Sequence, residues 1–318
     1  MKKLFSLAFG IMVSIATMAQ PKVYFTKDIS PESLVKIYKA LGREAHGRVA
    51  VKISTGEGGN THYLKPTLIR QLVEEVNGTI VECCTAYGGS RQDKAKHWQT
   101  IHEHGFDSIF AVDIMDEFGE IRIPIKDQKH LKYDIVGEHL ANYDFMINLA
   151  HFKGHTMGGF GGVLKNASIG VASTAGKAYI HSHGVTADSQ ECWKHTQPQD
   201  SFLESMAAAA QAVHEYFDRG KNILYINVMN NMSVDCDCVD HPEPVKFEDY
   251  GILAPPAPVA LDQACIDIIN QQKVTATNDP TDLLSRIDQQ HGVHTIDHAA
   301  QIGLGSKQYQ VVNIDEAK

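Results

Sequence analysis

The sequence predicts an α/β fold in which a mainly parallel or mixed sheet is flanked by helices, with a ligand site at the carboxyl ends of the strands. Short apolar segments that lack polar alternation are typical of strands buried on both faces. Amphipathic helical patterns separate these segments, as in other α/β domains. The segments that follow several strands are rich in glycine and polar residues, which indicates ligand-binding loops, because open parallel sheets bind ligands at that edge.

The strands are predicted from short apolar runs that are bounded by polar residues or glycine. Parallel pairing would bring the loops that follow them to one edge of the sheet. We expect seven strands along the chain, at residues 23–25, 48–53, 79–83, 108–112, 144–149, 222–228 and 309–314.

Helices are predicted where capping residues precede an amphipathic pattern. Ser30 suits the N-cap position of one helix, and a second helix begins after Lys65. The stretches 151–199 and 229–258 are irregular, apart from a helical piece within the first, and long segments of this kind are usually functional. Five further helices are expected at residues 91–104, 201–219, 258–271, 280–290 and 296–302.

Residues 1–19 have the pattern of a secretory signal peptide. Lys2 and Lys3 precede a short apolar run, and small residues lie around Ala19, where cleavage is expected. The apolar run is too short to span a bilayer comfortably, and no second run of sufficient length follows. The sequence therefore predicts a soluble bacterial protein, periplasmic or secreted, whose residues 20–318 form a single α/β domain without a membrane span.

Charge and cysteine content narrow the function classes. The formal charge of −9 and the isoelectric point near 6.0, with lysine and arginine scattered, argue against nucleic-acid binding. Disulfides are allowed in an exported chain. However, the adjacent Cys83 and Cys84 and the Cys-x-Cys pair formed by Cys236 and Cys238 are unlike a disulfide framework. Metal binding or redox chemistry therefore competes with structural bridging.

The glycine-rich segment after residue 151 is the first candidate site. Lys153, His155 and Lys165 are the predicted catalytic residues, because the two lysines would bind or polarise an anionic substrate and histidine suits acid–base work near neutral pH. Glycines expose backbone N–H groups, and a helix N-terminus favours an anion. The alternative is a glycine-rich turn with solvated lysines. The predicted anion-binding residues are Gly159, Gly161, Gly162 and Asn166.

The second candidate site is a metal centre. Cys236 and Cys238 could both face one ion, and thiolate with imidazole ligands suits zinc or iron. His181 and His183 alternate along the chain, so in an extended segment both rings would lie on one side and could complete the site. The spacing differs from common zinc sites and ferredoxins. The alternatives are a redox-inert pair or a strained disulfide.

Two stretches resemble the domain of unknown function 362 family. The first spans residues 148–172 and includes Lys153-Gly154-His155, and the second joins 235–238 to the segments 249–254 and 258–262. The resemblance covers residues 22–312. Members are often described as iron–sulfur centre proteins, and many carry a ferredoxin-like insert with closely spaced cysteines. Here the corresponding segment, 173–198, contains only Cys192, so a four-iron cluster is not expected.

These observations leave three hypotheses open. The first is a metal-dependent enzyme, of redox or other chemistry, with an unknown small anionic substrate. The second is a periplasmic protein that binds a small anion without catalysis. The third is a protein whose cysteines are purely structural. The sequence predicts no oligomeric state and does not identify the substrate.

Overall fold

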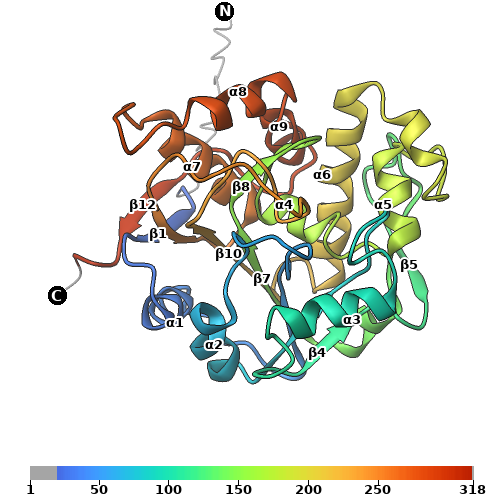
Figure 1. Ribbon diagram of the computed structural model, residues 1–318, viewed down its shortest axis with the longest axis horizontal. Helices are drawn as coiled ribbons and strands as arrows, with labels where there is room; N and C mark the ends of the chain where they lie inside the picture. The colour runs from blue at the N-terminus through green and yellow to red at the C-terminus, as the bar shows by residue number, and fades with distance from the viewer. Residues whose placement is uncertain (1–19, 317–318) are drawn as a thin grey trace, which may run out of the picture.

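The structure is a computed structural model that describes residues 20–316. The predicted signal peptide, residues 1–19, lies outside the described residues. An eight-stranded mixed sheet of order β12-β1-β11-β10-β7-β2-β3-β4 forms the centre, and helices cover it (Figure 1). The predicted α/β fold is confirmed. Among residues 20–316, no helix combines the length and apolar character needed to cross a membrane.

Five adjacent strands form the parallel part of the sheet. Their carboxyl ends therefore point to the same edge, as the sequence predicts. These strands are β2 (Val49–Lys52), β3 (Gly78–Glu82), β4 (Val112–Ile114), β7 (Phe145–His151) and β10 (Ile223–Met229).

Three strands complete the other side of the sheet, and they are β1 (Lys22–Thr26), β11 (Gly251–Ala254) and β12 (Gln310–Asn313). Strand β11 runs antiparallel to both of its neighbours, which makes the sheet mixed. Strand β11 is not predicted from the sequence, because its four residues lie inside a proline-containing segment that is expected to be irregular. Two separate hairpins were also missed, β5 (Glu120–Pro124) with β6 (Tyr133–Gly137) and β8 (Lys153–His155) with β9 (Gly159–Gly161).

The strand predicted at 108–112 is wrong over most of its length. The Phe110 N–H donates to the Phe106 carbonyl, so the chain makes a helical turn there. Both phenylalanines are buried, and a spacing of four residues places them on one side of that turn. The strand β4 begins only at Val112.

The helices lie close to the predicted positions. Ser30 caps the first, and Asp93, which the sequence analysis placed inside a helix, caps the third. The predicted helical piece within 151–199 is in fact two α-helices and a short 3-10 helix. The helices are α1 (Pro31–Ala40), α2 (Pro66–Glu75), α3 (Lys94–Glu103), α4 (Val163–Ala167), α5 (Thr174–His181), α6 (Gln199–Tyr216), α7 (Pro258–Asn270), α8 (Thr281–Gln289) and α9 (Val293–Gln301), with 3-10 helices η1 (Glu138–Asn142) and η2 (Cys192–His195).

The sheet separates two apolar cores. Helices α1, α2 and α3 pack on one face, and α4, α6, α7 and α9 pack on the other. Successive side chains of a strand point to opposite faces, so Val51 belongs to the first core and Ala50 to the second. Lys52 follows the same alternation and points toward the face that α4 covers. A charged side chain is thereby placed beneath the loops at the carboxyl edge.

Candidate active site

A cavity of about 150 Å³ lies at the carboxyl ends of the parallel strands. Four separate loops contribute to it, which is the convergence expected from the sequence. Its lining includes Lys52 and Ser54 at and after the end of β2, residues between Glu82 and Arg91 at and after the end of β3, residues between 153 and 170 after β7, and Cys236 to Cys238 after β10.

Cys236 and Cys238 form a disulfide in the wall of this cavity, with their Cα atoms 5.2 Å apart. Two backbone hydrogen bonds hold the loop: the Val239 N–H donates to the Cys236 carbonyl at 3.1 Å, and the Glu57 N–H donates to the Asp237 carbonyl at 2.7 Å. Cys236 is buried, whereas Cys238 is only half-buried. Of the two sulfur atoms, that of Cys238 is therefore the more accessible one.

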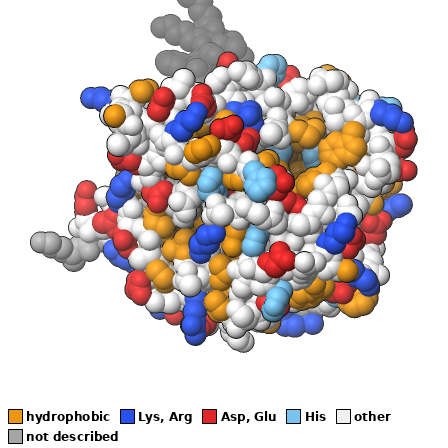
Figure 2. All heavy atoms as spheres, in the orientation of Figure 1, with side chains coloured by type: hydrophobic (Ala, Val, Ile, Leu, Met, Phe, Trp, Pro, Cys, Tyr) orange, Lys and Arg blue, Asp and Glu red, His pale blue; other side chains and the backbone are white. Residues whose placement is uncertain are grey.

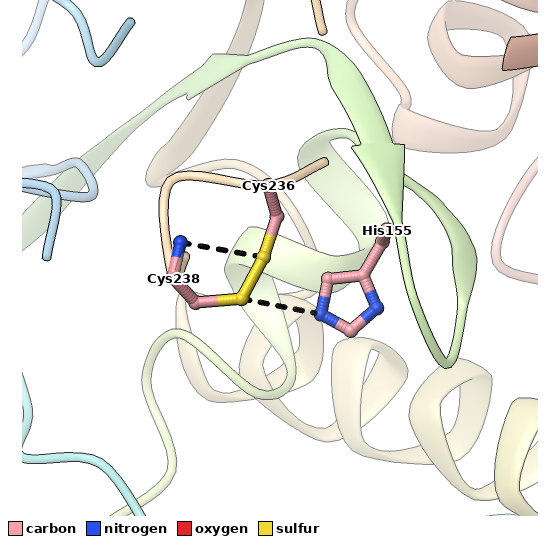
Figure 3. Close-up of side chains that lie close together, drawn as sticks. All are labelled: His155, Cys236 and Cys238. Atoms are coloured by element: carbon pink, nitrogen blue, oxygen red, sulfur yellow. Dashed lines mark hydrogen bonds between the residues drawn. A yellow bond between two sulfur atoms is a disulfide. The ribbon is translucent and has the colours of Figure 1, made fainter. Parts of the chain in front are cut away.

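His155 lies beside this pair (Figure 3). Its Nε2 atom is 3.9 Å from the Cys238 sulfur, and its Nδ1 atom accepts the N–H groups of Met157 and Gly158 at 3.1 and 2.9 Å. Because Nδ1 acts as an acceptor, the proton of the neutral ring is on Nε2 and points toward sulfur. Burial, reinforced by positive charge such as that of Lys165, lowers the pKa of His155 well below its ordinary range.

His155, Cys236 and Cys238 are also a group that could hold a metal ion, since their ligand atoms lie within 4.8 Å of one another. The donor set does not fit a metal in this state, for two reasons. The thiolates are joined in a disulfide, and metal-binding histidines usually donate their second ring N–H, whereas His155 Nδ1 accepts. A metal would require reduction of the pair and a change in the hydrogen bonds of the ring.

The extended segment predicted for His181 and His183 is wrong. Ser173 caps helix α5, and this helix continues through His181. The His181 Nδ1–H donates to the Lys177 carbonyl at 2.7 Å, and its ring faces the cavity. His183 instead donates to the Gln197 carbonyl at 3.0 Å and does not line the cavity. The histidine that lies beside the two sulfur atoms is therefore His155, which the sequence analysis assigned to acid–base chemistry.

Lys153 and Lys165 lie side by side in the cavity. Lys153 forms an ion pair with Asp237 at 2.7 Å, and His151 contacts the other oxygen of that carboxylate at 2.8 Å. A Cβ atom on Gly161 would lie 3.4 Å from Lys153 Cε and 3.7 Å from Lys165 Cδ, so the two chains pass this glycine together. Burial, followed by the charge of Lys153, lowers the pKa of Lys165 to about 7.

Three of the four predicted anion-binding residues line the cavity, and one lies outside it. Gly161, Gly162 and Asn166 line the cavity, but Gly159 packs against Gly292 outside it. The N-terminus of α4 is already occupied, because the Asp262 carboxylate accepts the first two helical N–H groups at 3.0 Å each. An external anion would therefore meet the lysines rather than this helix end.

Asn166 connects three elements of the site through hydrogen bonds of its side chain. Its side-chain amide donates to the Lys52 carbonyl at 3.0 Å and to the Asn148 side-chain oxygen at 2.7 Å. Its own side-chain oxygen accepts a hydrogen bond from the Lys52 ammonium at 3.1 Å. Asn166 thus joins α4 to strands β2 and β7.

Several charged residues of the site were missed from the sequence. Arg91 pairs with Glu82 at 2.6 Å and with Glu57 at 3.3 Å, and all three side chains are almost fully buried. Lys52 and Lys177 line the same cavity. One signal was available: Lys52 and Glu82 are charged residues at the ends of otherwise apolar strands, and such residues are rarely buried unless they are paired or functional.

The fold and site define an α/β protein with a cysteine–histidine centre in a cavity rich in lysine. Residues 49–267, more than half of the chain, match the family model described as Domain of unknown function (DUF362), and the chain belongs to this family. A search of curated proteins found no match.

Two solved structures are similar in fold. One is the lactate racemase apoprotein from Thermoanaerobacterium thermosaccharolyticum, with 15% identity, a TM-score of 0.37, and coverage of 66% of this chain and 50% of that one. The other is a protein from Thermotoga maritima, with 12% identity, a TM-score of 0.42, and coverage of 85% and 58%. This chain thus spans between half and three-fifths of either protein. Both similarities concern the arrangement of the fold alone.

Proposed function

We propose that the protein is a thiol–disulfide redox enzyme whose Cys236–Cys238 pair exchanges electrons with a small anionic thiol or disulfide bound in the cavity. The observation that carries this proposal is the disulfide in the cavity wall, with the Nε2–H group of His155 directed at Cys238 from 3.9 Å. A dithiol next to a hydrogen-bond donor and positive charge is favoured as thiolate. Lys165, which has no carboxylate partner in the described residues, supplies that charge.

The reaction would proceed in two exchanges. A substrate thiolate attacks the half-buried Cys238 sulfur, the S–S bond breaks, and Cys236 leaves as a thiolate. The Cys238 N–H, 3.3 Å from the Cys236 sulfur, donates to it. A second substrate thiolate then attacks the substrate sulfur of the mixed disulfide and releases Cys238, which receives the hydrogen bond of His155. Two substrate thiols have become one disulfide and their two electrons are on the cysteine pair, while the two protons lost when the substrate thiols ionised have gone to solvent.

The test compares two thiols of similar size, 3-mercaptopropionate and the uncharged 2-mercaptoethanol, as reductants of the purified full-length protein. Mass spectrometry after thiol alkylation would follow the Cys236–Cys238 disulfide. We expect the anionic thiol to react at least tenfold faster than the neutral one after correction for thiolate fraction. A double Cys236→Ser/Cys238→Ser variant would lose the reaction, while Cys265→Ala, a free buried cysteine outside the cavity, would keep it. Equal slow rates for both thiols would contradict the proposal.

A second candidate is a metal site in the reduced protein, which the short distances among His155, Cys236 and Cys238 favour. Catalytic zinc sites typically have three protein ligands of these types and a fourth coordination position open to substrate, and here that position would face the cavity. Elemental analysis of reduced and oxidised protein would separate the two candidates. Near one equivalent of zinc or iron in the reduced protein, lost in the double cysteine variant, would favour the metal. A reversible disulfide without bound metal would favour redox exchange.

We also infer export through the predicted leader. An oxidising compartment such as the periplasm would allow the disulfide to persist. Expression of the full chain in a bacterium, followed by fractionation and N-terminal sequencing, tests this inference. A mature chain that begins at Gln20 in the periplasmic fraction is expected, and an uncleaved cytosolic chain would contradict it.

A further inference from the structure

The cavity contains more positive charge than its carboxylates can neutralise. Arg91 pairs with Glu82 and with Glu57 behind it, and Lys153 pairs with Asp237. Three lysines of the lining have no carboxylate partner within residues 20–316. The chain as a whole is acidic, with a formal charge of −9, and Figure 2 shows basic side chains interspersed with acidic ones over the viewed face. The three unpaired lysines are Lys52, Lys165 and Lys177.

Lys52 and Lys177 are buried ammonium groups with neutral partners. Lys52 is 1% exposed, and its Nζ donates to the Ile53 carbonyl and the Asn166 side chain. Lys177 is 6% exposed, and its Nζ donates to the Ala172 carbonyl. Burial lowers the pKa of Lys52 to about 8. Neither ammonium forms an ion pair with a carboxylate in the described residues, and the Glu82 carboxylate only partly offsets the loss of water at Lys52, which is an expensive arrangement for a buried charge.

Lys165 has no hydrogen-bond or ion-pair partner in the described part of the chain, although its side chain is half-buried. The charges of Lys153, Arg91 and Lys52 oppose its own, and the Asp237 carboxylate, which favours it, is already paired with Lys153. The acidic group behind Lys177 is Asp134, which is fully buried and whose pKa burial raises to about 7. It is therefore a weak counter-ion near neutral pH.

We propose that Lys52, Lys165 and Lys177 form a subsite for a ligand group that carries two negative charges, of the phosphate or dicarboxylate type. Strand β2 and helices α4 and α5 hold the three side chains, so the charges are set in place before the ligand arrives. The remaining wall includes the apolar side chains of Met157 and Trp193. A cavity of about 150 Å³ is comparable to one that accepts benzene, which limits the ligand to a small molecule.

This inference deepens the proposed function, because it specifies the charge of the substrate that would occupy the same cavity. It can be tested without redox chemistry, in the full-length Cys236→Ser/Cys238→Ser protein. Thermal unfolding and calorimetric titration would be measured with inorganic phosphate, sulfate, succinate and acetate at constant ionic strength. We expect a dianion to raise the melting temperature and acetate to have little effect. A response to phosphate and sulfate but not succinate would indicate a phosphate-type ligand, and the reverse would indicate a dicarboxylate.

Two variants connect the response to Lys165 and Lys177. Lys165→Met and Lys177→Met should each weaken dianion binding at least tenfold, whereas Lys221→Met, an exposed lysine outside the cavity, should not. Loss of binding through misfolding is excluded by a second readout. Without ligand, Lys165→Met should melt about 2 °C higher than its parent, since it removes an unpaired charge.

Two outcomes would overturn the subsite. One is a phosphate, sulfate and succinate response no larger than that of chloride at equal ionic strength. The other is equal dianion binding in the parent protein and in both cavity variants. Either result would leave thiol exchange by Cys236 and Cys238 unaffected. Conversely, normal dianion binding in a protein whose disulfide never exchanges would remove the redox proposal and retain the subsite.

Discussion

At the scale of single residues, the site depends on which charges have partners. Lys153 is neutralised by Asp237, while Lys165, beside it at Gly161, is not. The difference follows from the Cys-x-Cys loop, which places Asp237 next to Lys153. An unpaired amine among cations is destabilised as an ammonium, so its protonation should be visible in the stability of the protein.

We predict that Lys165 makes stability rise with pH above neutrality. Its pKa is about 7 in the folded protein, against an ordinary value of 10.5. Between these values the unfolded chain binds the proton and the folded chain does not, so folding becomes more favourable as pH increases. The penalty is complete below pH 7 and disappears toward pH 10.5. Urea unfolding of wild type and Lys165→Met at pH 7, 8.5 and 9.5 should show the variant more stable at pH 7, with a gap that narrows as pH rises.

At the scale of elements, the β8–β9 hairpin brings the lysine and histidine to the disulfide. Gly154, between Lys153 and His155, donates its N–H to the Ser233 carbonyl at 2.9 Å. Any Cβ atom at Gly154 would overlap the Val234 carbonyl. The hairpin and the cysteine loop therefore approach each other backbone to backbone, and only glycine permits this distance.

We predict that Gly154→Ala pushes the cysteine loop away from His155. The neighbouring backbone would have to move, at a cost of about 1–3 kcal/mol, and the Cys236–Cys238 pair should lose most of its rate of thiol exchange. Gly88→Ala is the control, because Gly88 is exposed and outside the cavity lining, and its Cβ would meet only a side-chain oxygen of Gln92, at 3.4 Å. Alkylation kinetics and urea unfolding of both variants test this. Equal behaviour of the two would show that the close approach is unimportant.

At the scale of the whole molecule, the sequence predicts the parallel strands and their loop edge, because buried apolar runs and glycine-rich exits are local patterns. Whether His155 or His181 lies beside Cys238 depends on contacts between segments that are far apart in the sequence, since 83 residues separate His155 from Cys238. Lys177 was missed for the same reason, because it is unremarkable in sequence and reaches the cavity only through the packing of α5, whereas Lys52 carried the local signal of a charge at the end of an apolar strand. The hydrogen bond from the first N–H group of α4 to Asp262 is also a long-range contact, between residues 99 positions apart.

The loops of the carboxyl edge are held together by Arg91. It joins Glu57 in the loop after β2 to Glu82 at the end of β3, and Glu82 also contacts His97 of α3 at 3.1 Å. Burial by itself would raise the pKa of Glu82, but Arg91 and His97 hold it well below its ordinary range. Because the Glu57 N–H binds the Asp237 carbonyl, this network also anchors the loop of the two cysteines.

Arg91→Met should therefore destabilise the whole protein rather than one loop, by about 3–5 kcal/mol, since it leaves two buried carboxylates without a counter-ion. The loss of stability caused by Arg91→Met should be larger at neutral pH than in acid. Without Arg91 the folded protein would favour the protonated carboxyl, so the loss is complete at pH 7 and becomes smaller as pH falls toward 4.5. Arg70→Met, which removes an exposed pair with Glu74, should change stability by less than about 1 kcal/mol. Urea unfolding of both variants at pH 7 and 4.5 provides the comparison, and an Arg91 effect as small as that of Arg70, or one that grows under acid, would show that the network does not hold the edge together.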